Sequence, residues 1–164
     1  MTATSRRLTI LALLALAPTA LATHQRDNLR DLKPADLCPP SAQVSLGDGE
    51  DEDFSALVQD ALDRYTGAWG LKWGDPEKCG VDQILTLDAY EDRGSFVYVA
   101  EFALEPRGDT VVQQGARRLR VKAPRLWGNL YYGTYDTEFQ DIATREIRDL
   151  YEGFLSDWTA AHRK

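Results

Sequence analysis

The chain has 164 residues, with 19 Lys or Arg against 26 Asp or Glu, and a formal net charge of −7. This length suits one domain with a sizeable hydrophobic core. The acidic balance argues against nucleic acid or an anionic lipid surface as the general partner. We therefore expect no nucleic-acid binding.

The first 22 residues have the layout of a cleavable signal peptide. Arg6 and Arg7 supply a positive start, residues 8–17 form an apolar stretch, and residues 20–22 read Ala-Leu-Ala, which suits signal peptidase. The apolar stretch is shorter than the roughly 20 residues that span a bilayer. We predict cleavage after Ala22 and an exported protein, periplasmic or secreted, without a membrane span.

The cysteines are two in number, Cys38 and Cys79. Outside the cytoplasm an even count favours a disulfide, with free thiols as the alternative. Half of a metal site would need histidine nearby, whereas His24 and His162 stand at the two ends of the exported chain. We predict a Cys38–Cys79 disulfide, no metal site and no cofactor.

After an irregular lead-in over residues 23–41, residues 42–164 are expected to form a single domain. A short strand is predicted at Ala42–Leu46. The acidic run over residues 47–53 lacks the spacing of an EF-hand, so it favours a helix N-terminus over a calcium site. Helical periodicity then predicts an amphipathic helix, carried by Phe54, Leu57, Val58, Ala61, Leu62 and Tyr65.

Three strands are predicted next, at Val81–Tyr90, Phe96–Glu105 and Thr110–Ala123. Apolar and polar residues alternate in the first and third, and one face of the second is shared by Phe96, Tyr98, Ala100, Phe102 and Leu104. This period of two is typical of strands. Glycine-containing turns at residues 91–94 and 106–109 separate them. Short turns between consecutive strands predict an antiparallel meander.

Residues 124–136 are predicted to be a loop, and a long helix follows. Thr137–Gln140 fits a capping box, and an apolar stripe at helical spacing reaches Trp158. Gly153 lies inside this helix, where a close packing contact would explain it. The predicted fold is α+β in two layers, an antiparallel sheet of about four strands with both helices on one face, in the order β-α-β-β-β-α.

Motifs for catalysis are missing from the sequence. Both histidines are terminal, and there is no G-x-S-x-G, P-loop, G-x-G-x-x-G or zinc signature, so no nucleophile and base can be assigned. A carboxylate pair stays open, because 26 acidic residues always allow some pairing in space. We assign no catalytic residues and turn to features that suit binding.

A basic row reverses the local charge of this acidic protein. It could hold a small anionic ligand or the carboxylates of a partner protein. Alternatively, the charges blunt the solvent face of a strand and pair with Glu101 or Glu105. The candidate anion or partner site consists of Arg118, Arg120, Lys122 and Arg125.

Aromatic residues crowd the segment after this row, beside two glycines. Rings with polar tips suit a ligand or protein surface, but in a loop of this length they could also fold back and close the core. The candidate aromatic surface consists of Trp127, Tyr131, Tyr132 and Tyr135.

The C-terminal third ends a strand at Val121–Ala123, continues with Trp127-Gly128 and Gly133, and closes a helix with Phe-x-x-x-Trp at Phe154–Trp158. Over roughly residues 42–161 this pattern resembles small exported bacterial proteins of unknown function, and more distantly auxiliary envelope proteins that assist transport or outer-membrane assembly. The resemblance implies an accessory role in the envelope and carries no catalytic residues.

Such auxiliary proteins are often lipoproteins, which need a cysteine directly after the cleavage site. Here Cys38 lies sixteen residues past Ala22, so this chain departs from that pattern. We expect a soluble exported accessory or binding protein that uses its sheet edge, basic row or aromatic segment. The alternatives are a hydrolase with converging carboxylates, or a carrier or sensor of a small ligand in a pocket lined by several of Trp69, Trp73, Tyr98, Trp127 and Tyr131.

Overall fold

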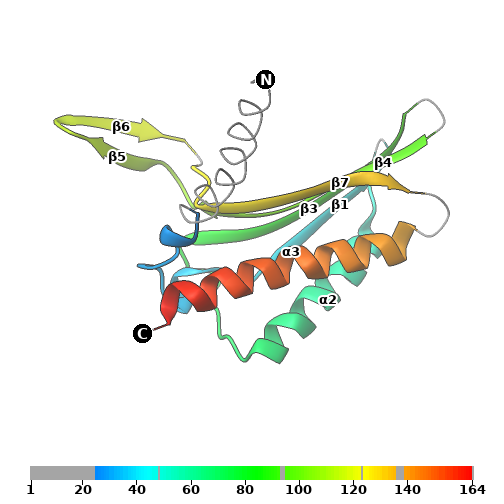
Figure 1. Cartoon of the computed structure of the whole chain (residues 1–164), viewed down its shortest axis with the longest axis horizontal. Coiled ribbons are helices and arrows are strands. Elements are labelled where there is room, and N and C mark those ends of the chain that lie inside the picture. Colours follow the sequence, from blue (N-terminus) through cyan, green and yellow to red (C-terminus); the bar gives the residue numbers. More distant parts are fainter. Residues whose placement is uncertain (1–24, 48, 93–94, 123, 136–138, 164) are drawn as a thin grey trace, which may run out of the picture.

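The computed structural model describes residues 25–47, 49–92, 95–122, 124–135 and 139–163. The predicted signal peptide and its cleavage site lie outside these residues, as does Thr137 of the predicted capping box. The fold has two layers, in which helices α2 (Glu52–Trp69) and α3 (Phe139–His162) cover one face of a sheet (Figure 1). The predicted α+β class is confirmed.

The main sheet has five strands in the order β2-β1-β3-β4-β7. β1 is parallel to β3, and the other neighbours are antiparallel. The predicted antiparallel sheet of about four strands is therefore wrong in strand number and direction. The reason is the helical crossover α2, because such a connection brings the chain back to start the next strand in the same direction. The strands are β1 (Ser41–Leu46), β2 (Gly49–Glu50), β3 (Val81–Asp92), β4 (Ser95–Pro106) and β7 (Trp127–Tyr135).

The predicted strand Thr110–Ala123 is also wrong, because this segment folds back on itself. β5 (Thr110–Gln114) and β6 (Arg117–Val121) form a separate two-stranded sheet. Gly115 lies in the turn between them with φ = 61°, a left-handed backbone conformation that glycine adopts without steric cost. The hairpin projects away from the two helices (Figure 1).

The predicted loop at residues 124–136 contains strand β7, which pairs with β4 from Trp127 opposite Leu104 to Tyr135 opposite Phe96. Aromatic side chains suit this pleated surface. Gly133 belongs to the strand because the ring of Tyr98 crosses it, and a Cβ at position 133 would lie 3.0 Å from that ring. The glycines that suggested a loop thus mark close packing within a strand.

Helix α2 confirms the predicted amphipathic helix and the role of the acidic run at its start. The carboxylate of Asp51 accepts a hydrogen bond from the amide nitrogen of Phe54 at 2.8 Å, and Gly70 ends the helix with φ = 66°. This is the N-cap arrangement that satisfies an otherwise unpaired amide. Phe54, Val58 and Leu62 are buried against the sheet side of the helix.

Aromatic rings fill the space between the sheet and α3. Phe102 on β4 lies 5.2 Å from the ring centroid of Tyr151 and 5.3 Å from that of Phe154. The hydroxyl groups of Tyr151 and Thr66 are hydrogen-bonded at 2.8 Å. Burial raises the pKa of Tyr151 to about 12, so this hydroxyl stays protonated at neutral pH.

The lead-in belongs to the packed body of the protein, although its backbone is irregular. Leu29 and Leu37 are fully buried, and a short 3-10 helix, η1 (Pro34–Asp36), lies between them. Cys38 and Cys79 form a disulfide with an S–S distance of 2.08 Å. The predicted disulfide is therefore confirmed.

The close contact predicted at Gly153 is wrong, because a Cβ at this position would meet no atom within 4 Å. We expect Gly153→Ala to raise the free energy of unfolding by about 1 kcal/mol, since alanine is the better helix former and restricts the unfolded chain. Urea unfolding measures this. Gly74→Ala serves as the contrast and should destabilise, because its Cβ would lie 2.2 Å from the carbonyl oxygen of Ala35. A loss of stability in Gly153→Ala would contradict the open space seen here.

Candidate functional site

The β5–β6 hairpin is the first candidate, and we call residues 109–122 the basic hairpin. Among the described strands, β5 and β6 pair only with each other. Val111 and Leu119 on this hairpin are 60% and 46% exposed. A lone two-stranded hairpin is at best marginally stable in water, so apolar residues exposed on it are candidates for burial against another molecule.

Charge on the basic hairpin opposes that of the whole chain. Its residues include four cations and one acid, Asp109, which gives +3 within a chain of net charge −7. Nε of Arg120 lies 2.9 Å from Oδ2 of Asp109. In the described part of the chain, no ion pair joins the other cations of the hairpin to a carboxylate; these are Arg117, Arg118 and Lys122.

The strand register mixes basic and apolar side chains on the hairpin. Arg120 stands opposite Val111, and Arg118 stands opposite Gln113. Residues directly opposite in an antiparallel pair share a face, so Arg118, Arg120 and Val111 lie on one face while Leu119 lies on the other. Both faces therefore present apolar surface next to positive charge.

Arg125 occupies a different place from the other residues of the predicted basic row. It follows β6 and forms ion pairs with Glu101 and, at 3.4 Å, with Glu105 on β4. This is the pairing that the sequence analysis offered as the alternative to an anion site. Exposed pairs of this kind contribute about 0–1 kcal/mol. The four basic residues thus do not form one cluster, and the hairpin carries the part that is open to a partner.

The predicted aromatic surface divides between the two faces of β7. Trp127 is buried on the helix-facing side, and Tyr131 and Tyr135 are half-buried there. The rings of Tyr135 and Phe139 lie 3.9 Å apart between centroids, and burial raises the pKa of Tyr135. Tyr132 points to the opposite side of the sheet and is 80% exposed. Of the four rings, Tyr132 is the one fully presented to solvent.

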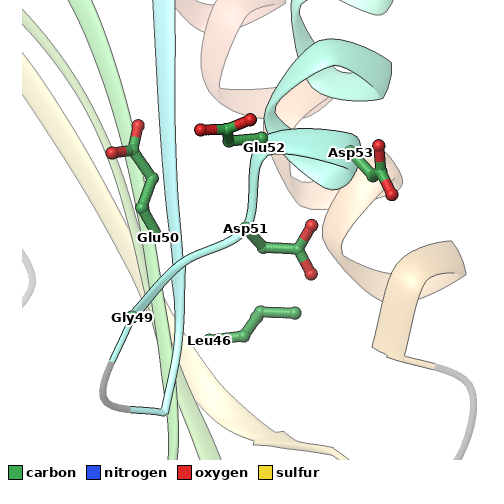
Figure 2. Close-up of a pocket in the computed structure, with 6 residues that line it drawn as sticks. All are labelled: Leu46, Gly49, Glu50, Asp51, Glu52 and Asp53. Atoms are coloured by element: carbon green, nitrogen blue, oxygen red, sulfur yellow. The ribbon is translucent and has the colours of Figure 1, made fainter.

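An acidic depression lies where β1 leads into α2, with a volume of about 370 Å³. Figure 2 shows that Glu50 and Asp53 point to opposite sides of it. Asp51 is already engaged as the helix cap. Across the described residues, no three His, Cys, Asp or Glu side chains are grouped as metal ligands. The lining of the depression is Leu46, Gly49, Glu50, Asp51, Glu52 and Asp53.

Four of the five aromatic residues suggested for a ligand pocket belong to the core or pack against it. Tyr98 and Trp127 are buried, and the ring of Trp73 lies 6.4 Å from that of Phe154 and 6.2 Å from that of Trp158. Trp69 is half exposed at the end of α2. Tyr98 and Trp127 likewise pack against core rings, since Tyr98 lies 5.9 Å from Phe139 and Trp127 lies 5.5 Å from Phe154 between ring centroids.

No family model, curated protein or solved structure matches this chain. The resemblance to envelope proteins therefore stays a prediction. Within the residues described, no helix is both long and apolar enough to cross a membrane.

Sequence reasoning identified Arg118, Arg120 and Lys122 but missed the hairpin that presents them. The available signal was Gln114-Gly115-Ala116, a glycine-containing step in the middle of a segment too long for a single ordinary strand. It also missed the edge strand β7, because Gly128 and Gly133 obscured the alternation of the residues between them.

Proposed function

We propose that this chain is an exported accessory protein of the cell envelope, which binds a partner protein with an acidic surface through the basic hairpin. The observation that carries the proposal is the separation of this hairpin from the core. It exposes Val111 and Leu119 beside Arg117, Arg118 and Lys122, which form no ion pair in the described part of the chain. Within the described residues, the hydrophobic core and the side chains packed against it include no residue of this hairpin.

A protein partner suits the chemistry of this surface. Arginine is enriched at protein interfaces and among the few residues that supply most of the binding energy. Positive charge on an otherwise acidic molecule steers an acidic partner to one place and raises the association rate. Binding would also bury a hairpin that is marginal alone.

Export is supported by three separate features. The N-terminal 22 residues have the signal-peptide layout. The disulfide between Cys38 and Cys79 suits an oxidising compartment. The C-terminal pattern resembles exported bacterial proteins. The competing functions have less support, because Tyr98 and Trp127 of the suggested pocket are buried in the core and Asp51 is already engaged as the helix cap.

Charge reversal on the hairpin tests this function. We expect Arg118→Glu with Arg120→Glu to reduce partner recovery on the order of 10-fold or more, because like charges then meet at the interface. Recovery is measured by crosslinking in intact cells, affinity purification of the exported protein and quantification of each co-purified protein. Arg64→Glu with Arg145→Glu is the matched control, since both residues are exposed and the change in net charge is the same.

The result that supports the proposal is one protein captured by the unmodified chain and by the control but lost from the hairpin variant. Equal capture by all three would remove the basic hairpin as the binding surface. If nothing is captured while a known envelope complex is recovered in parallel, the binding function itself fails and a carrier or enzyme becomes the better hypothesis.

A further inference from the structure

Strand β7 is the end strand of the main sheet among the described strands, and its composition is unusual for an edge. Its nine residues, Trp127–Tyr135, include no charged residue and no proline. Natural edge strands are commonly protected by lysine, proline, a bulge or a covering segment, since an open edge pairs with other chains. Here Leu130 and Tyr132 are 44% and 80% exposed.

Contacts from other described segments reach only the beginning of this edge. Oε1 of Gln25 accepts from the amide nitrogen of Gly128 at 3.5 Å. The amide nitrogen of Leu130 donates to Oδ1 of the neighbouring Asn129 at 2.9 Å. Nδ2 of Asn28 also donates to the carbonyl oxygen of Leu126 at 2.8 Å, just before β7. A strand that pairs along the whole of β7 would therefore displace the side chain of Gln25, while residues 131–134 carry no such contact from the lead-in among the described residues.

We infer that β7 pairs with β7 of a second copy of this chain, antiparallel, about a two-fold axis at Tyr131. This register uses all nine residues of both strands. It places Leu130 opposite Tyr132 of the partner subunit, and the symmetry repeats that pair. Cross-strand contacts between an aromatic and an aliphatic side chain are favourable. The two five-stranded sheets would continue into one another, with all helices on the same side.

Charge selects a second copy over a charged partner at this edge. In the two-fold register no charged residue of β7 faces another, because Trp127–Tyr135 contains none. An acidic or basic strand would find no opposite charge on β7 to pair with. A two-fold contact also uses the same edge of both copies. Strand pairing through β7 therefore stops at the dimer, because no free β7 edge is left for a third copy.

The size of the contact sets the expected affinity. Nine residues at about 3.4 Å each make a strand of roughly 30 Å, and one strand pair falls at the low end of the 1,200–2,000 Å² or so that stable complexes bury. We therefore expect a dimer that dissociates on dilution. This inference is independent of the proposed partner, since the basic hairpin and the β7 edge share no residue.

Paired charges on the edge test the dimer. Leu130→Lys with Tyr132→Lys places lysine opposite lysine twice in the stated register, so we expect dimerisation to weaken on the order of 100-fold or more. Sedimentation of the exported protein over a wide concentration range measures this. Leu57→Lys with Tyr90→Lys is the matched control, because both are about half exposed and lie on α2 and β3, and it should dimerise as the unmodified chain does.

Charge rescue tests the register itself. Leu130→Glu with Tyr132→Glu should also be monomeric, whereas an equimolar mixture of the lysine and glutamate variants should form the dimer again. If the variants fail to fold, amide exchange of the unmodified protein decides. We expect the β7 amides to exchange more slowly as concentration rises across the dissociation range.

Three results would overturn the inference. If the protein is monomeric at all concentrations and its β7 amides exchange fast, β7 does not pair with a second copy, and a strand of another protein becomes the expected occupant of this edge. A monomer with slow-exchanging β7 amides would mean that this chain covers its own edge. A dimer that survives Leu130→Lys with Tyr132→Lys would place the contact on another surface.

Discussion

Replacing Cys38 and Cys79 with alanine is expected to lower the free energy of unfolding by about 4 kcal/mol. The two residues are 41 positions apart, and opening a loop of that length releases about this much conformational entropy in the unfolded chain. Both cysteines are buried, so alanine leaves small cavities but no unpaired polar group. Denaturant unfolding of the exported protein, with and without the substitutions, measures the difference.

The disulfide reinforces a junction that hydrogen bonds already form. The amide nitrogen of Cys38 donates to the carbonyl oxygen of Val81 at 2.8 Å, and that of Gly80 donates to the carbonyl oxygen of Asp36 at 3.0 Å. The native geometry is therefore set without the covalent bond, so its loss should act mainly on the unfolded chain. We expect the double variant to keep its fold and its far-ultraviolet spectrum.

Reduction gives the control for this experiment. A reductant should destabilise the unmodified protein by a similar amount and leave the alanine variant unchanged. Two free thiols in the unreduced exported protein, or equal stability of the two proteins, would contradict a structural disulfide.

Elements with strong periodicity were predictable from the sequence. The stripe from Phe54 to Tyr65 has the spacing of a helix, and α2 forms there with Asp51 as its cap. The alternation in β3 and β4 also appears as burial, since Leu85, Leu87 and Phe102 face the helices. In these segments the local pattern and the tertiary packing select the same structure.

Strand direction and strand membership depended on contacts that are distant in sequence. The pairing of Ser41–Leu46 with β3 is parallel because α2 returns the chain to the start of the sheet. The alternation of apolar and polar residues around Gly115 fits one long strand and a hairpin equally well. The turn at Gly115, with its left-handed backbone, makes the segment a hairpin. Gly133 suggested a loop because glycine is common in loops. Its actual role, making room for the ring of Tyr98 on the adjacent strand β4, depends on a contact that is distant in sequence.

The candidate binding residues were predictable as residue types but not as a surface. Arg118 and Arg125 are close in sequence, yet Arg125 is taken up by Glu101 on the sheet while Arg118 lies on the hairpin. Successive side chains of a strand point to opposite faces of the sheet, so Trp127 and Tyr132 lie on different faces. This could be assigned only once residues 127–135 were known to form a strand. Spatial clustering, rather than composition, was the missing information.

Trp127→Ala is expected to lower the free energy of unfolding by about 3–5 kcal/mol, because it removes a large aromatic side chain from a packed core. The indole is 3% exposed and its ring lies 5.5 Å from that of Phe154 and 6.0 Å from that of Phe102. Its Nε1 donates to Oδ2 of Asp157 at 3.0 Å. The substitution leaves both a cavity and a carboxylate without this donor.

Tyr132→Ala on the same strand is the matched control, and its effect should stay within about 0.5 kcal/mol at concentrations where the chain is monomeric. Trp127→Phe keeps a ring in the core but removes the donor to Asp157, so its loss should fall between the two. A small effect of Trp127→Ala would contradict the packing seen here and return the ring to the candidate binding surface. A large one would fix Trp127 as core and leave Tyr132 to carry the exposed aromatic contact of β7.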